Sequence, residues 1–244
     1  RAPGSRAGCT EVAASVPGLR VGHVGVADSR WAWAQGLWAV ATLTMVVGAV
    51  LSLTQTDIKR LLAYSSIAHA GFVLTGLLAF DKVGVSAVMF YLVAYGFSTI
   101  AAFAIVSMVR DGGSEATHLS QWAGLGKNHP VVAGAFAFLL LAFAGIPLTS
   151  GFTAKFAVFS AAVGHGATVL AVVGVLSSAI AAFVYVRIIV LMYFSEPAGD
   201  SVSAVSPSIF TTVAVSIGVL VTLVLGVAPS PLLDLAARSS LFLP

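Results

Sequence analysis

One lysine lies inside a long apolar run, residues 130–163, shortly after a cluster of helix-breaking residues. Lys155 follows the stretch Gly145–Gly151, and the nearest charges in the sequence are Lys127 and Arg187. A charge inside a long apolar run is costly, so this lysine is by default a candidate functional site. Facing a hydrated interior, its amine could exchange protons near neutral pH, because desolvation disfavours the charged form. Alternatively, if the run reaches the surface soon after the break, the amine could extend to water.

Two further ionisable side chains lie within apolar runs. His69 is either a neutral histidine hydrogen-bonded to a neighbouring helix or a proton-relay group, because imidazole titrates near neutral pH. Arg187 lies near the end of its run, so we expect its guanidinium to extend toward the nearer surface.

A polar stripe is predicted on one helix face, formed by Tyr91, Tyr95 and either Ser98 or Thr99. Such side chains most often hydrogen-bond between helices. A stripe that leads toward a buried lysine could also hold a chain of water. Cys9 is the single cysteine, so the sequence predicts no disulfide framework and no metal cluster. We therefore predict proton-transfer residues but no catalytic or metal site.

The composition is that of an integral membrane protein. Mean hydropathy is +1.02, 59% of residues are hydrophobic and only 9% are charged, against about 25% charged in soluble domains. Long period-2 alternation is missing from the sequence, which argues against barrel strands. The formal charge of +3 is too small and too scattered to indicate nucleic acid as a partner.

Six apolar segments are long enough to span a bilayer, at residues 36–56, 61–80, 84–109, 130–163, 167–194 and 207–228. The fourth would extend about 50 Å as a straight helix, against about 30 Å of hydrocarbon. It must break, and Gly145, Pro147 and Gly151 mark the place, where the hydroxyls of Thr149 and Ser150 can satisfy the freed backbone groups. No acidic residue lies within this run, so an acidic partner of its lysine would come from another helix or subunit. We expect an all-α polytopic membrane helix bundle of about six spans, one of them broken, over residues 36–237. An atypical stretch, 1–35, precedes it, and a short tail, 238–244, follows. The two longer loops, 110–129 and 195–206, contain breakers at residues 112–114 and 197–200.

The distribution of basic residues predicts the orientation. Lys59, Arg60, Arg110 and Lys127 fall on the side that is reached after the first segment. The stretch 1–35 begins with Arg1 and contains four arginines but no span, and we interpret it as a truncated or excised end. If those four arginines are discounted, the side reached after the first segment is cytoplasmic, and both chain ends lie outside.

Two stretches together carry a family resemblance. Residues 54–71, TQTDIKRLLAYSSIAHAG, and residues 144–156, AGIPLTSGFTAKF, resemble signatures of the antiporter-like membrane subunits of respiratory complex I, the proton-translocating NADH-quinone oxidoreductase. The resemblance covers about residues 36–237. Tyr91, Tyr95 and Thr99 stand where other close members carry histidines and a lysine, so the chain is most similar to the subunit N branch.

The resemblance implies roles for single residues in the second half of an inverted-repeat, antiporter-like fold. Lys155 matches the lysine of the broken helix, which is proposed to exchange a proton in this family, and His69 matches a position in the helix that follows the turn at residues 57–60. Asp57 and Lys59 match a charged turn that is structural or supports coupling, and Tyr91 and Tyr95 are supporting polar residues.

The resemblance also implies an assembly. The chain would be a subunit of an enzyme in the bacterial plasma membrane, contacting other membrane subunits and lipid. It carries no dinucleotide fingerprint and no cluster of metal ligands, so it would hold no cofactor itself. NADH and quinone would be used elsewhere in the assembled complex.

Two alternatives remain open at this stage. The chain could belong to a multisubunit monovalent cation/proton antiporter, although Tyr91 and Tyr95 argue against that reading. It could also be a non-conducting membrane scaffold, because the first half of the family fold has no counterpart here. Glu11 stands where the family has a lysine, which puts independent proton transfer in doubt.

Overall fold

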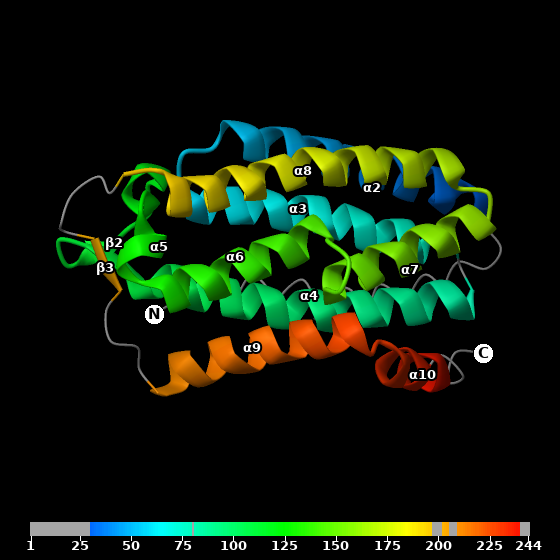
Figure 1. Cartoon of the computed structure of the whole chain (residues 1–244). Coiled ribbons are helices and arrows are strands. Elements are labelled where there is room, and N and C mark those ends of the chain that lie inside the picture. Colours follow the sequence, from blue (N-terminus) through cyan, green and yellow to red (C-terminus); the bar gives the residue numbers. More distant parts are fainter. Residues whose placement is uncertain (1–29, 80, 197–201, 205–208, 240–244) are drawn as a thin grey trace.

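The computed structural model describes residues 30–79, 81–196, 202–204 and 209–239 (Figure 1). Among these, side chains are described from Ala34 onward, except at residues 202–204 and 239. The expectations for residues 1–29, including those that concern Cys9 and Glu11, lie outside the described residues. The same holds for the predicted breaker at residues 197–200 and for the end of the tail, 240–244.

Each apolar segment of the sequence forms helix, as the hydropathy pattern predicts. The helices are α2 (Arg30–Thr54), α3 (Ile58–Leu77), α4 (Lys82–Met108), α6 (Pro130–Ala144), α7 (Ser150–Gly164), α8 (Thr168–Phe194), α9 (Ile209–Val227) and α10 (Ser230–Ser239). By length and composition, α2, α4, α8 and α9 can cross a membrane, and α6 is a shorter apolar helix. The prediction of an all-α, polytopic membrane bundle is confirmed.

Local sequence signals fix several helix starts. Asp57 and Asp81 are the N-caps of α3 and α4, and the Asp81 carboxylate accepts a hydrogen bond of 2.7 Å from the Gly84 amide. Pro130 is the first residue of α6, where its missing N–H costs nothing.

One end of the bundle carries a small antiparallel sheet. Strands β1 (Val109–Asp111), β2 (Ser114–Glu115) and β3 (Val202–Ala204) pair in the order β2-β1-β3, with Arg110 opposite Glu115 and Val109 opposite Ala204. A 3-10 helix, η2 (Leu119–Trp122), and the short helix α5 (Leu125–Asn128) follow β2. The sequence predicted a loop with a breaker at Gly112 and Gly113, and these two residues do form the turn. The strands and short helices around the turn were not expected.

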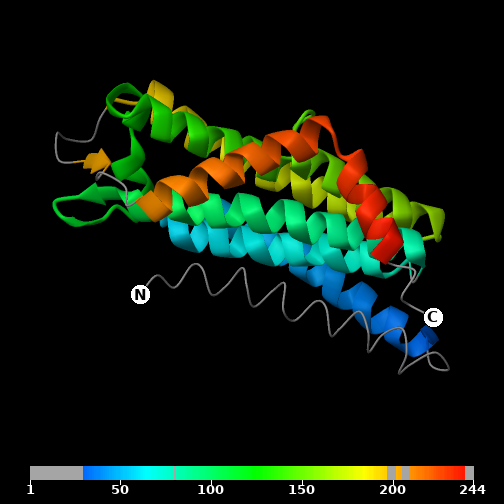
Figure 2. The same ribbon diagram turned by 90° about the horizontal axis from the view of Figure 1, so that it is seen from below.

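The opposite end of the bundle holds α10. Figure 2 shows α9 running alongside α4 and the chain then turning into α10 at the far end from the sheet. The sequence analysis did not anticipate this last helix, because residues 230–239 contain no apolar run.

Helices α6 and α7 together form the broken fourth segment, and they meet near the middle of the bundle (Figure 1). Gly145 ends α6 in the left-handed region, with φ 83°, and its amide donates to the carbonyls of Leu141 and Ala142. A Cβ at Gly151 would collide with the Ala142 carbonyl, so the first turn of α7 lies against the last turn of α6. The fourth segment is therefore interrupted between Ala144 and Ser150, where Gly145 and Pro147 lie, and Gly151 is the second residue of α7.

The apolar core is divided into two clusters on either side of this break. One cluster, near the sheet, contains Trp122, Phe136 and Tyr185, and the other contains Met45, Phe72 and Tyr91. The ring of Tyr95 packs against both clusters. The break and the residues around it thus lie where two well-packed regions join.

Candidate functional site

The amine of Lys155 is buried at the helix break. The residue is only 6% exposed, and its Nζ donates hydrogen bonds to the carbonyl oxygens of Phe143 and Ala144, at 2.7 and 3.0 Å. A third bond of 2.7 Å runs to the Ser178 hydroxyl on α8. The last carbonyls of a helix lack intrahelical partners and carry partial negative charge, so they suit an ammonium group. The alternative in which Lys155 extends to the surface is therefore wrong.

The surroundings of this amine are neutral. It lies 5.3 Å from the centre of the Phe72 ring, within the range of a cation–π contact. Within the described part of the chain, the ion pairs found do not include Lys155. The sequence analysis expected any acidic partner to come from another helix or subunit, and the partners seen here are two backbone carbonyls and a serine.

His69 lies in α3 and is 3% exposed. Its Nδ1 is 2.7 Å from the Tyr91 hydroxyl on α4, and its ring stacks on that of Tyr95 with centres 4.4 Å apart. The contact with Tyr91 is the interhelical hydrogen bond that is expected if His69 is a neutral, structural histidine. The second ring nitrogen, Nε2, is buried and has no hydrogen-bond partner among the residues that the structure describes.

Aromatic rings separate His69 from the Lys155 amine. The Phe72 ring centre lies 5.4 Å from that of His69, and the Phe143 ring centre lies 5.7 Å from it. Phe143 thus touches both groups, with its ring against His69 and its carbonyl bonded to Lys155. The structure brings Lys155, His69, Tyr91 and Tyr95 together around the break, without a direct hydrogen bond between the two ionisable groups.

The polar stripe on α4 mostly pairs with other helices. The Tyr95 hydroxyl donates to Ser66 on α3 at 2.7 Å, and Ser98 lies 2.8 Å from Thr222 on α9. The neighbouring Ser65 is hydrogen-bonded to Tyr185 on α8. Interhelical pairing therefore accounts for most of these groups, whereas the buried Thr99 hydroxyl has no partner.

A small cavity of about 10 Å³ opens beside His69, on the α4 side of the break. Its walls come from α3, α4 and both halves of the broken helix: His69, Tyr91, Ala94, Tyr95, Ser98, Ala142, Phe143, Ser150, Gly151 and Ala154. The sequence analysis expected the hydroxyls of Thr149 and Ser150 to bond to the freed backbone. Thr149 does so, donating to the Ile146 carbonyl at 2.7 Å, but the buried Ser150 hydroxyl has no partner.

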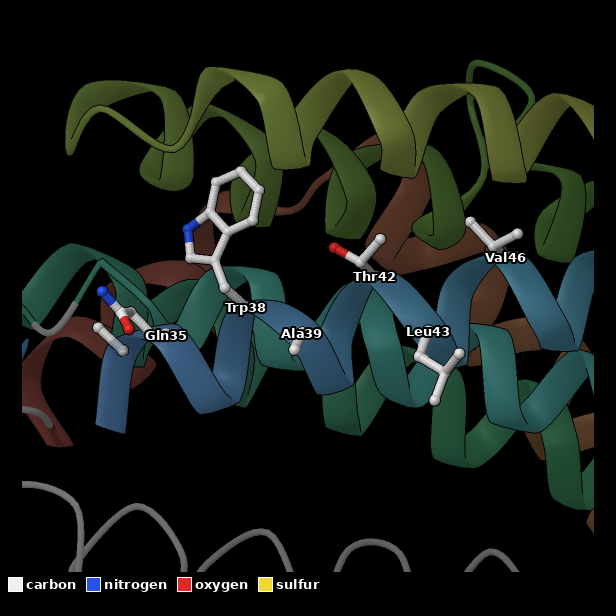
Figure 3. A pocket seen from close by; sticks show the side chains of 7 residues that line it. Gln35, Trp38, Ala39, Thr42, Leu43 and Val46 are labelled. Atoms are coloured by element: carbon white, nitrogen blue, oxygen red, sulfur yellow. The ribbon is translucent and has the colours of Figure 1, made fainter. Parts of the chain in front are cut away.

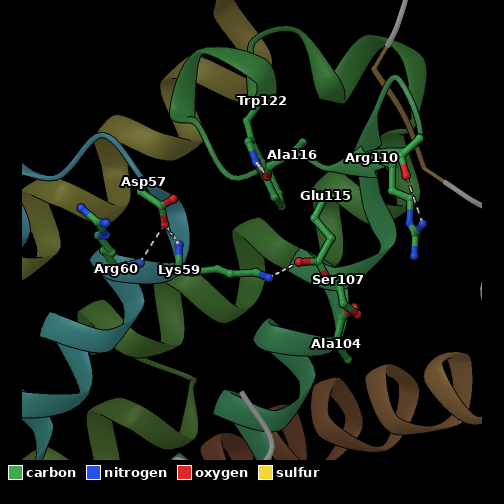
Figure 4. A network of polar contacts seen from close by, with 10 residues as sticks. Asp57, Lys59, Arg60, Ala104, Ser107, Arg110, Glu115, Ala116 and Trp122 are labelled. Atoms are coloured by element: carbon green, nitrogen blue, oxygen red, sulfur yellow. Dashed lines mark hydrogen bonds and ion pairs between the residues drawn. The ribbon is translucent and has the colours of Figure 1, made fainter. Parts of the chain in front are cut away.

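Asp57 and Lys59 lie elsewhere, at the sheet-bearing end of the bundle (Figure 4). The Asp57 carboxylate accepts hydrogen bonds from the backbone amides of Lys59 and Arg60, at 2.9 and 3.0 Å, and so caps α3. The Lys59 side chain forms an ion pair with Glu115 of β2. Asp57 precedes His69 by about 18 Å along the helix axis. The structure does not bring this charged turn to the break.

Arg187 also lies away from the break. Its side chain is exposed and donates to the Leu53 carbonyl, at 3.4 Å, near the end of α2 that adjoins the sheet. This position agrees with the expected extension toward the nearer surface.

A groove of about 950 Å³ runs along α2 (Figure 3). It is lined by Ala34, Gln35, Trp38, Ala39, Thr42, Leu43 and Val46. None of these side chains ionises, so this groove is not a candidate for proton transfer.

Sequence reasoning missed two members of the site, the Ser178 hydroxyl and the Phe143 carbonyl, and it assigned the Ser150 hydroxyl a backbone partner that the structure does not show. Ser178 could have been found, because Ser177 and Ser178 form a polar pair within an apolar segment. The other two features could not be predicted from residue types, because they depend on how α6 and α7 meet. These features are the unpaired state of the Ser150 hydroxyl and the bond that the Phe143 carbonyl accepts.

Comparisons with known proteins agree with this architecture. The family model described as "NADH:quinone oxidoreductase/Mrp antiporter, TM" matches residues 9–181. A protein from Rhodococcus opacus named NADH-quinone oxidoreductase subunit N is 59% identical over 97% of this chain and 44% of its own length. The protein of that name from Salinispora arenicola is 61% identical over 98% of this chain and 46% of its own length. The chain therefore spans about half the length of the curated relatives it matches.

Two solved structures share the fold. A chain of respiratory complex I from Thermus thermophilus superposes with a TM-score of 0.73 at 31% identity, over 83% of this chain and 46% of that chain. A chain of the Mrp complex from Dietzia has a TM-score of 0.75 at 24% identity, over 88% of this chain and 48% of that chain, and supports the fold alone.

Proposed function

This chain belongs to the NADH:quinone oxidoreductase/Mrp antiporter family of transmembrane proteins, and on that premise we propose that it is a proton-translocating membrane subunit of an NADH-quinone oxidoreductase, of the subunit N type. It contributes no catalytic residue to the redox reaction. NADH and quinone act at other subunits, and this chain moves protons in response.

The observation that carries the proposal is the buried Lys155 amine at the helix break. An amine that is held by neutral acceptors in an apolar bundle gains or loses a proton when a nearby charge changes, because Coulomb interactions are strong at low dielectric. A redox-driven change of charge in a neighbouring subunit would act on Lys155 in this way. His69, near Lys155 and joined to Tyr91, is the second group on the route.

The charged turn has a supporting role in this proposal. Asp57 caps α3 and Lys59 ties the helix to the sheet, so these residues hold the position of α3, which carries His69. Neither residue exchanges the transported proton.

We place the subunit in the bacterial plasma membrane, with the sheet-bearing end in the cytoplasm and both chain ends outside. Lys59 and Arg60 lie in the first turn of α3, Arg110 in β1 and Lys127 in α5, all at the sheet end of the bundle. Cytoplasmic ends of membrane bundles carry an excess of such basic residues. Other membrane subunits of the oxidoreductase and the lipid bilayer are its partners.

The test is NADH-driven acidification of inverted membrane vesicles that carry wild type or Lys155→Ala. Loss of a group that transfers protons directly should lower the acidification rate about 100-fold. Lys82→Ala is the matched control, since Lys82 is exposed at the start of α4, and it should pump normally. Equal pumping by wild type and Lys155→Ala would refute the proposal and favour a non-conducting scaffold.

The same vesicles separate the second candidate, a monovalent cation/proton antiporter. The family description and the fold of the Mrp complex both allow it. An antiporter would dissipate an imposed proton gradient when sodium is added without NADH. We expect no such response.

A further inference from the structure

Two residues that line the same small cavity each carry a buried polar atom with no hydrogen-bond partner among the described residues. His69 Nε2 and Ser150 Oγ are both fully buried, and both residues line the cavity of about 10 Å³ beside the helix break. Buried polar atoms are nearly always hydrogen-bonded, because an unmade bond leaves their desolvation uncompensated. Two such atoms at one cavity therefore point to a shared ligand.

The neighbours of His69 fix which ring nitrogen carries the proton. Tyr91 is 1% exposed, and among the described residues the acceptor shown for its hydroxyl proton is His69 Nδ1. If the hydroxyl donates to Nδ1, then Nδ1 is the acceptor of the neutral ring, and Nε2 carries the hydrogen. The group that faces the cavity is therefore an N–H donor in need of an acceptor.

The size and lining of the cavity limit the ligand. A volume of about 10 Å³ is close to the smallest that admits one water molecule, and it excludes anything larger. The lining contains no carboxylate, so a cation finds no charged partner there. A water molecule needs two or more polar partners, and the lining residues His69 and Ser150 carry the two unpaired atoms, Nε2 and Oγ.

We propose that this cavity binds one ordered water molecule that accepts from His69 Nε2 and bonds to Ser150 Oγ, and that Ser150 is a positioning residue for His69. The water fixes the tautomer and orientation of the imidazole, which is the state in which His69 exchanges a proton. It also ties α3 to the first turn of α7. The proposal rests on the function proposed above, in which His69 takes part in proton transfer.

The two ionisable groups lie on opposite sides of the break and contact different parts of it. On the α8 side, Lys155 is bonded to the end of α6 and to Ser178. On the α4 side, the start of α7 offers the Ser150 hydroxyl to the cavity that His69 shares. A movement of α7 relative to α6 would therefore alter the surroundings of both ionisable groups at once.

The experiment is a cryo-EM map of the assembled oxidoreductase, at a resolution that shows ordered waters, for wild type and Ser150→Ala. In wild type we expect density within hydrogen-bond distance of both His69 Nε2 and Ser150 Oγ. In Ser150→Ala this density should be lost, and NADH-driven proton translocation should fall about five-fold, the effect of losing one neutral hydrogen bond.

Two further variants separate a positioning role from a packing role. Ser160→Ala removes a hydroxyl from the same helix that is exposed and bonds only to the Ala157 carbonyl, and it should leave density and pumping unchanged. Ser150→Thr keeps the hydroxyl and should keep both the water and most of the pumping.

Three results would overturn the proposal. These are a wild-type map without the water, a Ser150→Ala protein with unchanged water and pumping, or a Ser150→Thr protein as impaired as Ser150→Ala. Failure of the proposed function gives a different pattern, because pumping would then be insensitive to Lys155→Ala while the maps still report the water.

Discussion

The protein holds its charged side chains in two different ways at the sheet end and at the break. At the sheet end, Asp57, Lys59 and Glu115 are partly exposed, and they bond to one another or to the backbone of a single helix start. At the break, Lys155 is buried and bonds to the carbonyls that end another helix. The first arrangement remains in contact with solvent and the second does not.

The physical consequences of the two arrangements differ in size. Ion pairs near solvent contribute about 1 kcal/mol or less and weaken with salt. A buried charge must be compensated by well-placed partners, or it destabilises the fold by several kcal/mol. We therefore expect substitutions at the break to alter both stability and proton transfer, and substitutions at the sheet end to alter stability alone.

The largest effect on stability is expected for Gly151→Ala. The added methyl would collide with the Ala142 carbonyl, and backbone atoms of a packed helix cannot rotate away. Such overpacking should cost about 3 kcal/mol or more. The measurement is thermal unfolding of the purified assembly in detergent, together with the amount of chain in the membrane.

Gly164→Ala provides the control on the same helix. Nothing lies within 4 Å of a Cβ at Gly164, and its φ is not positive, so alanine should fit without loss. If the two variants unfolded at the same temperature, the close approach of α6 and α7 at Gly151 would not be the constraint that we infer.

A smaller effect is expected for Asp57→Ala at the sheet end. The variant loses the two hydrogen bonds that cap α3 and should destabilise the protein by about 1 kcal/mol, whereas Asp57→Asn keeps an acceptor and should lose less. Proton pumping per assembled complex should not change in either variant. If proton pumping fell by more than the amount of assembled protein, the sheet end would affect proton transfer as well as stability, contrary to this expectation.

The smallest effect is expected for Glu115→Gln. The ion pair with Lys59 has side chains that are 30% and 41% exposed, so its loss should cost about 0.5 kcal/mol at low salt. At high salt the difference from wild type should vanish, because the pair is screened. A difference that persisted at high salt would mean that the pair is protected from solvent in the assembled complex.

Most of the helical architecture could be predicted from the sequence, because membrane-spanning helices need long apolar runs and such runs are easily recognised. The break was predictable for the same reason, since the run 130–163 is too long and contains Gly145, Pro147 and Gly151. Lys155 and His69 were predictable as candidates, because ionisable residues are rare in apolar segments.

The remainder depends on tertiary contacts. Helix α10 and the strands around Gly112 contain no apolar run from which they could be predicted. The packing of α10 on α4 and the pairing of β1 with β3 join segments that are distant in the sequence. The partners of Lys155 are mainly peptide carbonyls, which every residue carries, so no sequence pattern could single them out. The Ser150 hydroxyl was expected to bond to the backbone, but Thr149 takes that role.

The carbonyl partners of Lys155 have a consequence for the fate of its proton. A carboxylate partner could take up the proton that the ammonium releases, and the proton would then stay within the pair. Peptide oxygens accept hydrogen bonds but do not take up protons near neutral pH. A proton that leaves Lys155 must therefore travel to a more distant group or to water. Because the partial negative charge beside the ammonium lies mainly on main-chain carbonyls, no single side-chain replacement can remove it.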